Sequence, residues 1–237
     1  MKITVISHCW AGRFPHYGYA LAYQLSSFLL HKPRTCEVVP TVCYNPDDTL
    51  TVTCLKFFQE QGLGMRLIPL SMPALGRRCI GRNLAALETD ADLVWFTDAD
   101  WVFGEGCLDA LAGWGWPTAC SIAYPPYSLV SVDHATGDIA TGRMADGFKV
   151  ADIVPDEFVT KHYNRAIGPT QIVRGEYARQ YGYLNDHPMA RERDDGNYFG
   201  DFRDDIVFRN SCQARGKQMR VLLPNLSRLR HTETTYQ

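Results

Sequence analysis

Two aspartates at the end of an apolar run have a spacing that could do chemistry. Leu93–Thr97 is predicted to be a buried strand, and Asp98 and Asp100 follow it with one residue between them. In open parallel sheets, ligands bind beyond the carboxyl ends of the strands. Two neighbouring carboxylates favour a cation with oxygen ligands, such as Mg²⁺ or Mn²⁺, whose open positions a nucleotide diphosphate could fill. The alternative is a turn before Gly104 that both residues merely cap.

Arginines form a second group of candidate residues. Arg77, Arg78 and Arg82 lie at the start of a predicted helix, where they could hold phosphate or ribose. Arg228, Arg230 or Arg82 could add bidentate contacts to a diphosphate whose negative charge grows in a transition state. A solvated basic face is the alternative for any one of them.

The first hundred residues must form the elements that position these side chains. Apolar runs and helical stripes alternate there four times, which with short crossovers predicts a parallel, right-handed, doubly wound sheet. Pro40 would forfeit a ladder hydrogen bond, so its strand is expected to be interrupted or to lie at an edge. The expected strands are 3–7, 37–44, 65–70 and 93–97, and the expected helices are 21–29, 50–61 and 77–87.

The regular alternation of predicted strands and helices ends after residue 115. Residues 145–165 show no clear period, and we find no internal repeat or linker. We therefore expect one α/β domain with two sub-regions, 1–115 and 116–237. In the second sub-region the expected strands are 118–123, 129–132, 166–173 and 219–223, and the expected helices are 176–181 and 204–214.

Composition excludes several classes of protein. Hydrophobic residues make up 46% of the chain and charged residues 21%, which argues against disorder. A formal net charge of −2 provides no field that would recruit nucleic acid or anionic membranes. The 8 cysteines have no C-x-x-C spacing and are expected to be reduced and buried, as in a cytosolic protein. The apolar run at the start is too short for a signal peptide or a membrane span.

Three segments together resemble a known family. The stretch GRNLAALETDADLVWFTDADWVF (81–103) resembles the core signature of GT-A fold glycosyltransferases, especially family 2. IGPTQIVRGEYARQYGYLND (167–186) is similar to the acceptor-side segment of that family, and FRDDIVFRNSCQARG (202–216) resembles its acidic motif. The resemblance implies a GT-A-like, mixed but mainly parallel α/β sheet. Its N-terminal half, 1–115, would bind the nucleotide sugar, and 116–237 would hold the acceptor and the base.

The activity that the resemblance implies is metal-dependent transfer of a sugar, with inversion. The donor would be a nucleotide-diphosphate sugar, with a UDP-sugar favoured, and the acceptor would be a hydroxyl group. Asp98 would contact the ribose or the metal, and Asp100 would bind the Mn²⁺ or Mg²⁺ that bridges the diphosphate. His231 would complete the metal shell, and Arg82 would contact the donor.

The resemblance also implies the remaining site residues. Ser7 and His8 would border the base of the nucleotide, and Asp47 would contact the nucleoside. Asp205 or Asp204 would deprotonate the acceptor hydroxyl. The family usually has Glu-Asp at this pair, so the choice of base stays open, and differences after the first two strands indicate a divergent member.

The acceptor is expected to be a glycan, a lipid-linked molecule or a small molecule, and not a nucleic acid. The expected location is the cytoplasm, with peripheral membrane association as an alternative. A rival function is that of a sugar-phosphate nucleotidylyltransferase, which ranks lower because Gly12 alone could hardly wrap a triphosphate. A non-catalytic relative that binds a nucleotide or glycan is the other alternative.

Overall fold

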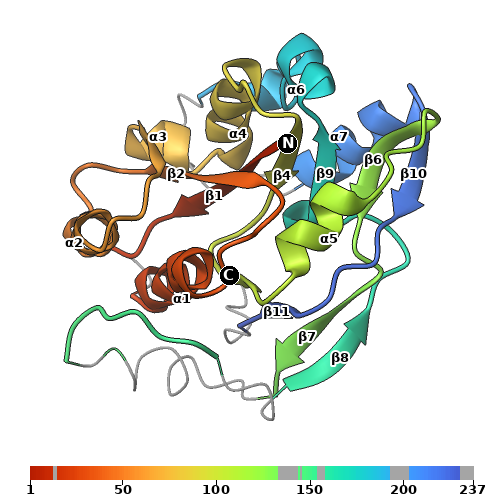
Figure 1. The fold of residues 1–237 in the computed structure, drawn as a ribbon. Helices are drawn as coiled ribbons and strands as arrows, with labels where there is room; N and C mark the ends of the chain where they lie inside the picture. Colours follow the sequence, from red (N-terminus) through yellow and green to blue (C-terminus); the bar gives the residue numbers. More distant parts are fainter. Residues whose placement is uncertain (13–14, 133–143, 145, 154–157, 193–202, 230–237) are drawn as a thin grey trace.

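A seven-stranded sheet forms the centre of the computed structural model, which describes residues 1–12, 15–132, 144, 146–153, 158–192 and 203–229 (Figure 1). The strand order is β10-β6-β9-β4-β1-β2-β3. All neighbouring pairs are parallel except those of β9, which runs antiparallel to both β4 and β6. The strands are β1 (Lys2–Cys9), β2 (Glu37–Tyr44), β3 (Arg66–Pro69), β4 (Leu93–Phe96), β6 (Cys120–Tyr124), β9 (Gln171–Arg174) and β10 (Lys217–Arg220).

Helices cover both faces of this sheet, which is why β4 in its centre is buried along its whole length. In Figure 1, α1 and α2 lie together on one face, while α4 and α6 lie on the other. The helices are α1 (His16–Leu30), α2 (Thr49–Glu60), α3 (Met72–Leu75), α4 (Arg78–Leu87), α5 (Cys107–Gly113), α6 (Gly175–Tyr181) and α7 (Asp204–Gln213).

Asp48 fixes the start of α2 and the loop after β1 at once. Its Oδ1 accepts a hydrogen bond from the Thr51 N–H at 3.2 Å, as a helix cap does. Its Oδ2 accepts from the Ala11 N–H at 2.7 Å. The carboxylate therefore ties the ends of β1 and β2 to one helix.

A second, smaller sheet has the strand order β5-β11-β7-β8. Because β11 runs antiparallel to β5, Arg228 is paired with Trp101, directly after the second aspartate of the Asp-x-Asp motif. The strands of this sheet are β5 (Trp101–Phe103), β7 (Tyr127–Ser131), β8 (Phe158–His162) and β11 (Leu226–Arg228).

The predicted α/β class and the mainly parallel sheet are confirmed, and three details differ. β2 is continuous and lies between β1 and β3, although Pro40 suggested an interrupted or edge strand. β3 pairs only with Thr41–Tyr44 of β2. Among the described residues no strand lies beside Pro40 on that side, so no strand there requires the backbone N–H that proline lacks. The strand expected over 166–173 starts late, because Gly168–Thr170 forms a short 3₁₀ turn. The short elements β5, β8, β11, α3 and α5 were not predicted.

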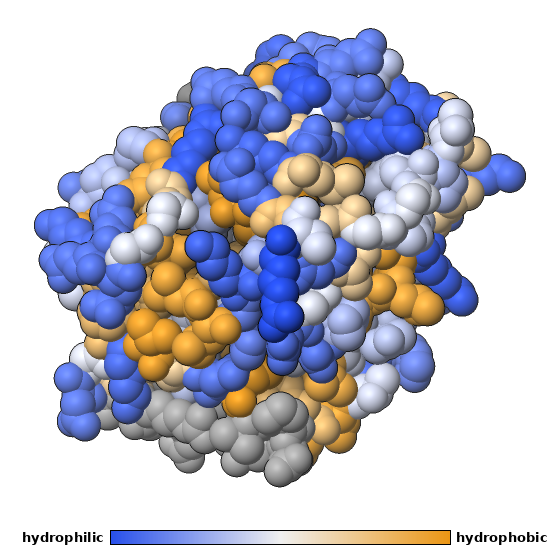
Figure 2. Space-filling model, in the orientation of Figure 1, coloured by the Kyte–Doolittle hydropathy of each residue, from blue (hydrophilic) through white to orange (hydrophobic). Residues whose placement is uncertain are grey.

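Hydrophobic and hydrophilic side chains both reach the surface of the described residues. The large hydrophobic side chains that are exposed are scattered along the chain, and Figure 2 shows that hydrophilic residues divide the hydrophobic areas of this face. None of the 8 cysteines forms a disulfide, and all but Cys36 are buried. Among the described residues, no helix combines the length and hydrophobicity that crossing a membrane requires.

Gly175 provides a test of how β9, α6 and the segment before β4 pack. A Cβ at Gly175 would lie 1.7 Å from the carbonyl oxygen of Ala91, so the backbone must shift. We expect Gly175→Ala to lower the free energy of unfolding by at least about 2 kcal/mol, or roughly 4–8 °C in Tm. In the control Gly113→Ala the added Cβ meets nothing within 4 Å, so the change should stay below about 1 kcal/mol. Thermal unfolding measures both, and equal Tm values would contradict the packing described.

Candidate functional site

The candidate site lies where the carboxyl ends of β1 and β4 meet. The Thr97 N–H donates to the Ile6 carbonyl at 2.9 Å, which keeps the two strand ends side by side. The buried Gln24 of α1 then holds the turn that follows. Its Nε2 donates to the carbonyl oxygens of Asp98 at 2.8 Å and Trp101 at 3.1 Å. The Asp-x-Asp segment is therefore fixed by its backbone as well as by its side chains.

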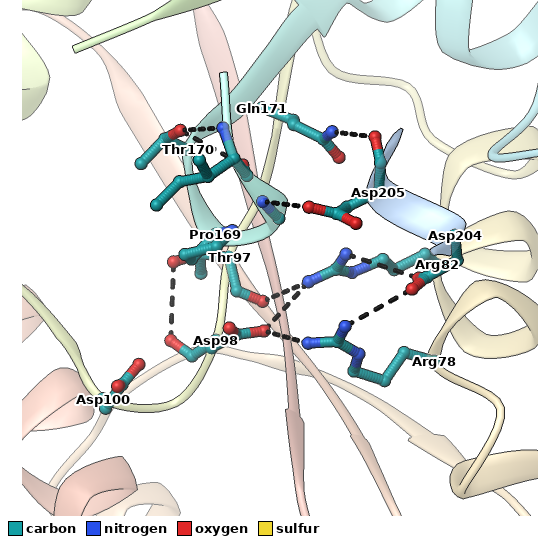
Figure 3. Close-up of polar contacts among 12 residues, drawn as sticks. Arg78, Arg82, Thr97, Asp98, Asp100, Pro169, Thr170, Gln171, Asp204 and Asp205 are labelled. Carbon is teal, nitrogen blue, oxygen red and sulfur yellow. Dashed lines mark hydrogen bonds and ion pairs between the residues drawn. The ribbon is translucent and has the colours of Figure 1, made fainter. Parts of the chain in front are cut away.

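Two arginines of α4 bind the first aspartate (Figure 3). Arg78 Nη1 lies 3.2 Å and Arg82 Nη2 3.0 Å from the same oxygen, Oδ1 of Asp98. The arginines are four residues apart, so they project from one face of the helix. Burial would raise the pKa of Asp98, but the charges of Arg78 and Arg82 outweigh it and leave the pKa below its ordinary value. Asp98 is thus a fixed carboxylate, with a side chain that is 25% exposed.

The guanidinium of Arg82 is fully buried. It connects its own helix, α4, to the end of β4, the turn after α6 and the start of α7. Besides Asp98, it donates to the Thr97 carbonyl at 3.1 Å and to the Tyr183 hydroxyl at 3.0 Å. The Tyr183 hydroxyl in turn donates to Gln171 Oε1 at 3.0 Å. Burial raises the pKa of Tyr183 far above its ordinary value, so the phenol keeps the proton that it donates.

The structure gives the two acidic residues at the start of α7 different surroundings. Asp204 is buried, and its carboxylate lies 3.3 Å from Arg78 Nη2 and 4.0 Å from Arg82 Nη1. Asp205 is only half-buried. Its Oδ2 accepts from the Gly168 N–H at 3.1 Å, and its backbone carbonyl accepts from Gln171 Nε2 at 2.8 Å. Among the described residues no arginine pairs with the Asp205 carboxylate, which is also less buried than that of Asp204 (Figure 3).

The residues predicted to border the nucleoside do not form one cluster. His8 packs against α4, where a Cβ at Gly81 would lie 2.5 Å from its Nε2. Neither ring nitrogen of His8 has a hydrogen-bond partner in the part of the chain that the structure describes. Burial, followed by the charges of Arg82 and Arg78, lowers the pKa of His8 well below its ordinary value, so the imidazole is neutral. Ser7 is buried in β1, and Asp47 is exposed in the loop after β2.

The predicted metal ligands do not fit a divalent cation in their described state. Asp100 is buried, with its side chain 2% exposed, and its Oδ2 accepts from Arg228 Nε at 2.8 Å. Asp98 is bound by two further guanidiniums, so positive charge already neutralises both carboxylates. His231 lies outside the described residues. Over the described ranges, no three His, Cys, Asp or Glu side chains gather as a metal would need.

Arg82 was predicted to contact the donor, but its guanidinium is fully buried in the structure. Arg82 instead positions Asp98 and Asp204. Tyr183 and Gln171 were not predicted as site residues, although both lie inside the segment that carried the family resemblance. The residues next to them in the sequence do not indicate that the Tyr183 hydroxyl and the Gln171 amide would lie close to the buried charge of Arg82. Pairing of β9 with β4 and packing of α6 against α4 bring them to Arg82.

Comparison with known proteins supports the fold. No protein-family model and no curated protein matches the chain. Among solved structures, S. aureus TarS 1–349 in complex with UDP-GlcNAc matches with a TM-score of 0.61 and 13% identity, over 100% of this chain and 62% of that one. TarS 1–349 in complex with UDP matches with a TM-score of 0.59 and 14% identity, over 97% and 60%. The chain thus spans about three fifths of the length of these structures and shares their GT-A fold.

Replacing Arg82 tests its role in the buried cluster. In Arg82→Met, Asp98 loses one of its two arginines and Asp204 keeps only Arg78, inside the protein. We expect the free energy of unfolding to fall by about 3–5 kcal/mol, since removing one partner of a buried ion pair leaves charge uncompensated.

The matched control is Arg66→Met, which breaks the more exposed pair of Arg66 with Glu88. Its cost should stay below about 1 kcal/mol. Urea unfolding of both variants measures the difference, and similar losses would refute a special role for Arg82.

Proposed function

We propose that the protein transfers a sugar from a nucleotide-diphosphate sugar to a hydroxyl acceptor with inversion. The observation that carries the proposal is the pair of acidic groups with opposite surroundings. Asp98 is an ionised carboxylate fixed by two arginines, and Asp205 is an accessible carboxylate fixed by one backbone N–H. The first suits binding of a donor and the second suits removal of a proton.

The donor would lie over the carboxyl ends of β1 and β4. Ligands of open α/β sheets bind at such ends. Because Arg78 and Arg82 both bind Oδ1 of Asp98, its Oδ2 is available to accept a hydrogen bond from a ribose hydroxyl. The TarS structures with the same fold hold UDP and UDP-GlcNAc, which supports a UDP-sugar as the first donor to test.

Asp205 is our candidate for the base. Its Oδ2 is bound by the Gly168 N–H, so its Oδ1 can accept the proton of an acceptor hydroxyl. Asp204 is unsuited to this task, because it is buried and already faces two guanidiniums. We propose a positioning role for Asp204, which leaves Asp205 as the better candidate of the two residues for the base.

The reaction balances with these groups. The acceptor oxygen attacks the anomeric carbon as Asp205 takes its proton, and the bond from that carbon to the diphosphate oxygen breaks. The electron pair of that bond stays on the nucleoside diphosphate, which leaves on the opposite face of the sugar. Attack opposite to the leaving group inverts the anomeric centre.

Asp205→Asn tests the assignment of the base. An amide cannot take the proton, so we expect turnover to fall by about 10²–10⁴-fold while UDP binding is unchanged. The measurement is UDP release from UDP-GlcNAc with a panel of hydroxyl acceptors, together with calorimetric titration of UDP.

Asp204→Asn is the comparison, and it should lower the free energy of unfolding because Arg78 and Arg82 lose a charge partner. Full turnover by Asp205→Asn would refute the assignment. A wild-type protein that binds no nucleotide diphosphate would refute the proposed function itself.

A further inference from the structure

We propose that Arg228 binds the diphosphate of the donor and supplies the positive charge that a divalent cation was predicted to supply. This inference rests on the proposed function, because it assumes a nucleotide-diphosphate donor at the end of β4. It differs from that function in making transfer independent of metal.

Arg228 is held in place beside the Asp-x-Asp segment. Its Nε donates to Asp100 Oδ2 at 2.8 Å, and the two residues are 128 positions apart in the chain. A backbone hydrogen bond links the same two segments, because the Leu229 N–H donates to the Asp100 carbonyl at 2.8 Å. Pairing of β11 with β5 then fixes the register, with Arg228 opposite Trp101.

The guanidinium of Arg228 also has hydrogen-bond donors that it leaves unused. Only Nε is bound to Asp100, and within the described residues the two Nη groups have no hydrogen-bond partner. The side chain of Arg228 is 26% exposed, whereas that of Asp100 is 2% exposed. The side chain of Arg228 is therefore partly accessible, whereas the carboxylate that it binds is not. The two Nη groups of one guanidinium form the planar fork that suits phosphate oxygens.

The surroundings of Arg228 make its charge permanent. The charge of Asp100 raises the pKa of Arg228 above its ordinary value, although partial burial acts in the opposite direction. Asp100 is therefore a positioning residue for a guanidinium. A divalent ion that bound Oδ2 of Asp100 would have to displace Arg228 from a buried ion pair, which is costly because the remaining charge is left without a partner.

Such a guanidinium would act on the leaving group. As the bond between the anomeric carbon and the diphosphate oxygen breaks, negative charge grows on the departing nucleoside diphosphate. A fixed cation beside it stabilises the transition state more than the ground state. Arg228 would therefore contribute to turnover as well as to binding.

Calorimetric titration of UDP and GDP into the protein tests the proposal, once with EDTA and once with Mn²⁺. We expect one of the two nucleotides to bind the wild type with the same affinity in EDTA as in Mn²⁺. Arg228→Gln should weaken that binding by about tenfold or more in EDTA, and Arg228→Lys should restore part of it. Arg215→Gln, which changes an exposed arginine of the loop after α7, is the matched control and should bind like the wild type.

Since Arg228→Gln leaves Asp100 buried without this arginine, the double variant Arg228→Gln/Asp100→Asn keeps the test valid if the single variant unfolds. It removes both charges and should also lose binding while its Tm stays near that of the wild type. Nucleotide binding that needs Mn²⁺, or that survives loss of Arg228, would overturn this inference alone. Binding of neither nucleotide to the wild type, with or without Mn²⁺, would overturn the proposed function and this inference together.

Discussion

The buried charge of Arg82 is the constraint on which the arrangement of the site depends. Removing an ion from water costs several kcal/mol even in a relaxed protein interior, so its partners must all be present together. These partners come from the end of β4, the turn after α6 and the first residue of α7. Contacts with this one guanidinium therefore help to fix the positions of the strand and helices that carry its partners. Asp98 and Asp204 owe their fixed positions to the same contacts.

Burial and the charges of Arg78 and Arg82 together set three protonation states. Arg78 and Arg82 keep Asp98 ionised against the effect of its burial. Burial together with the same charges keeps His8 neutral, although histidine otherwise titrates near neutral pH. Tyr183 stays protonated because burial is the largest influence on its pKa. A donor that reached this site would meet groups whose charge does not change over the physiological range of pH.

The sequence predicted the parts of the fold that local patterns encode and failed where distant pairing decides. The apolar run of β4, the helical stripe of α4 and the acidic start of α7 were visible in the local sequence. β5 and β11 have three residues each, too few for a period, and β8 shows mostly exposed side chains. The difference in surroundings between Asp204 and Asp205 could not be predicted from the sequence, because it depends on which side of α7 faces α4.

The long separation of the contacting residues has a consequence for how the protein folds. Arg78 and Asp204 are 126 positions apart, and Asp100 and Arg228 are separated by 128 positions. Contacts that close such large loops form slowly, because the entropy of closure is lost before the contact stabilises anything. Both halves of the sequence must therefore be in place before the charged cluster can assemble. Local elements such as α1 can form early, whereas the site is completed only when α7 and β11 have docked.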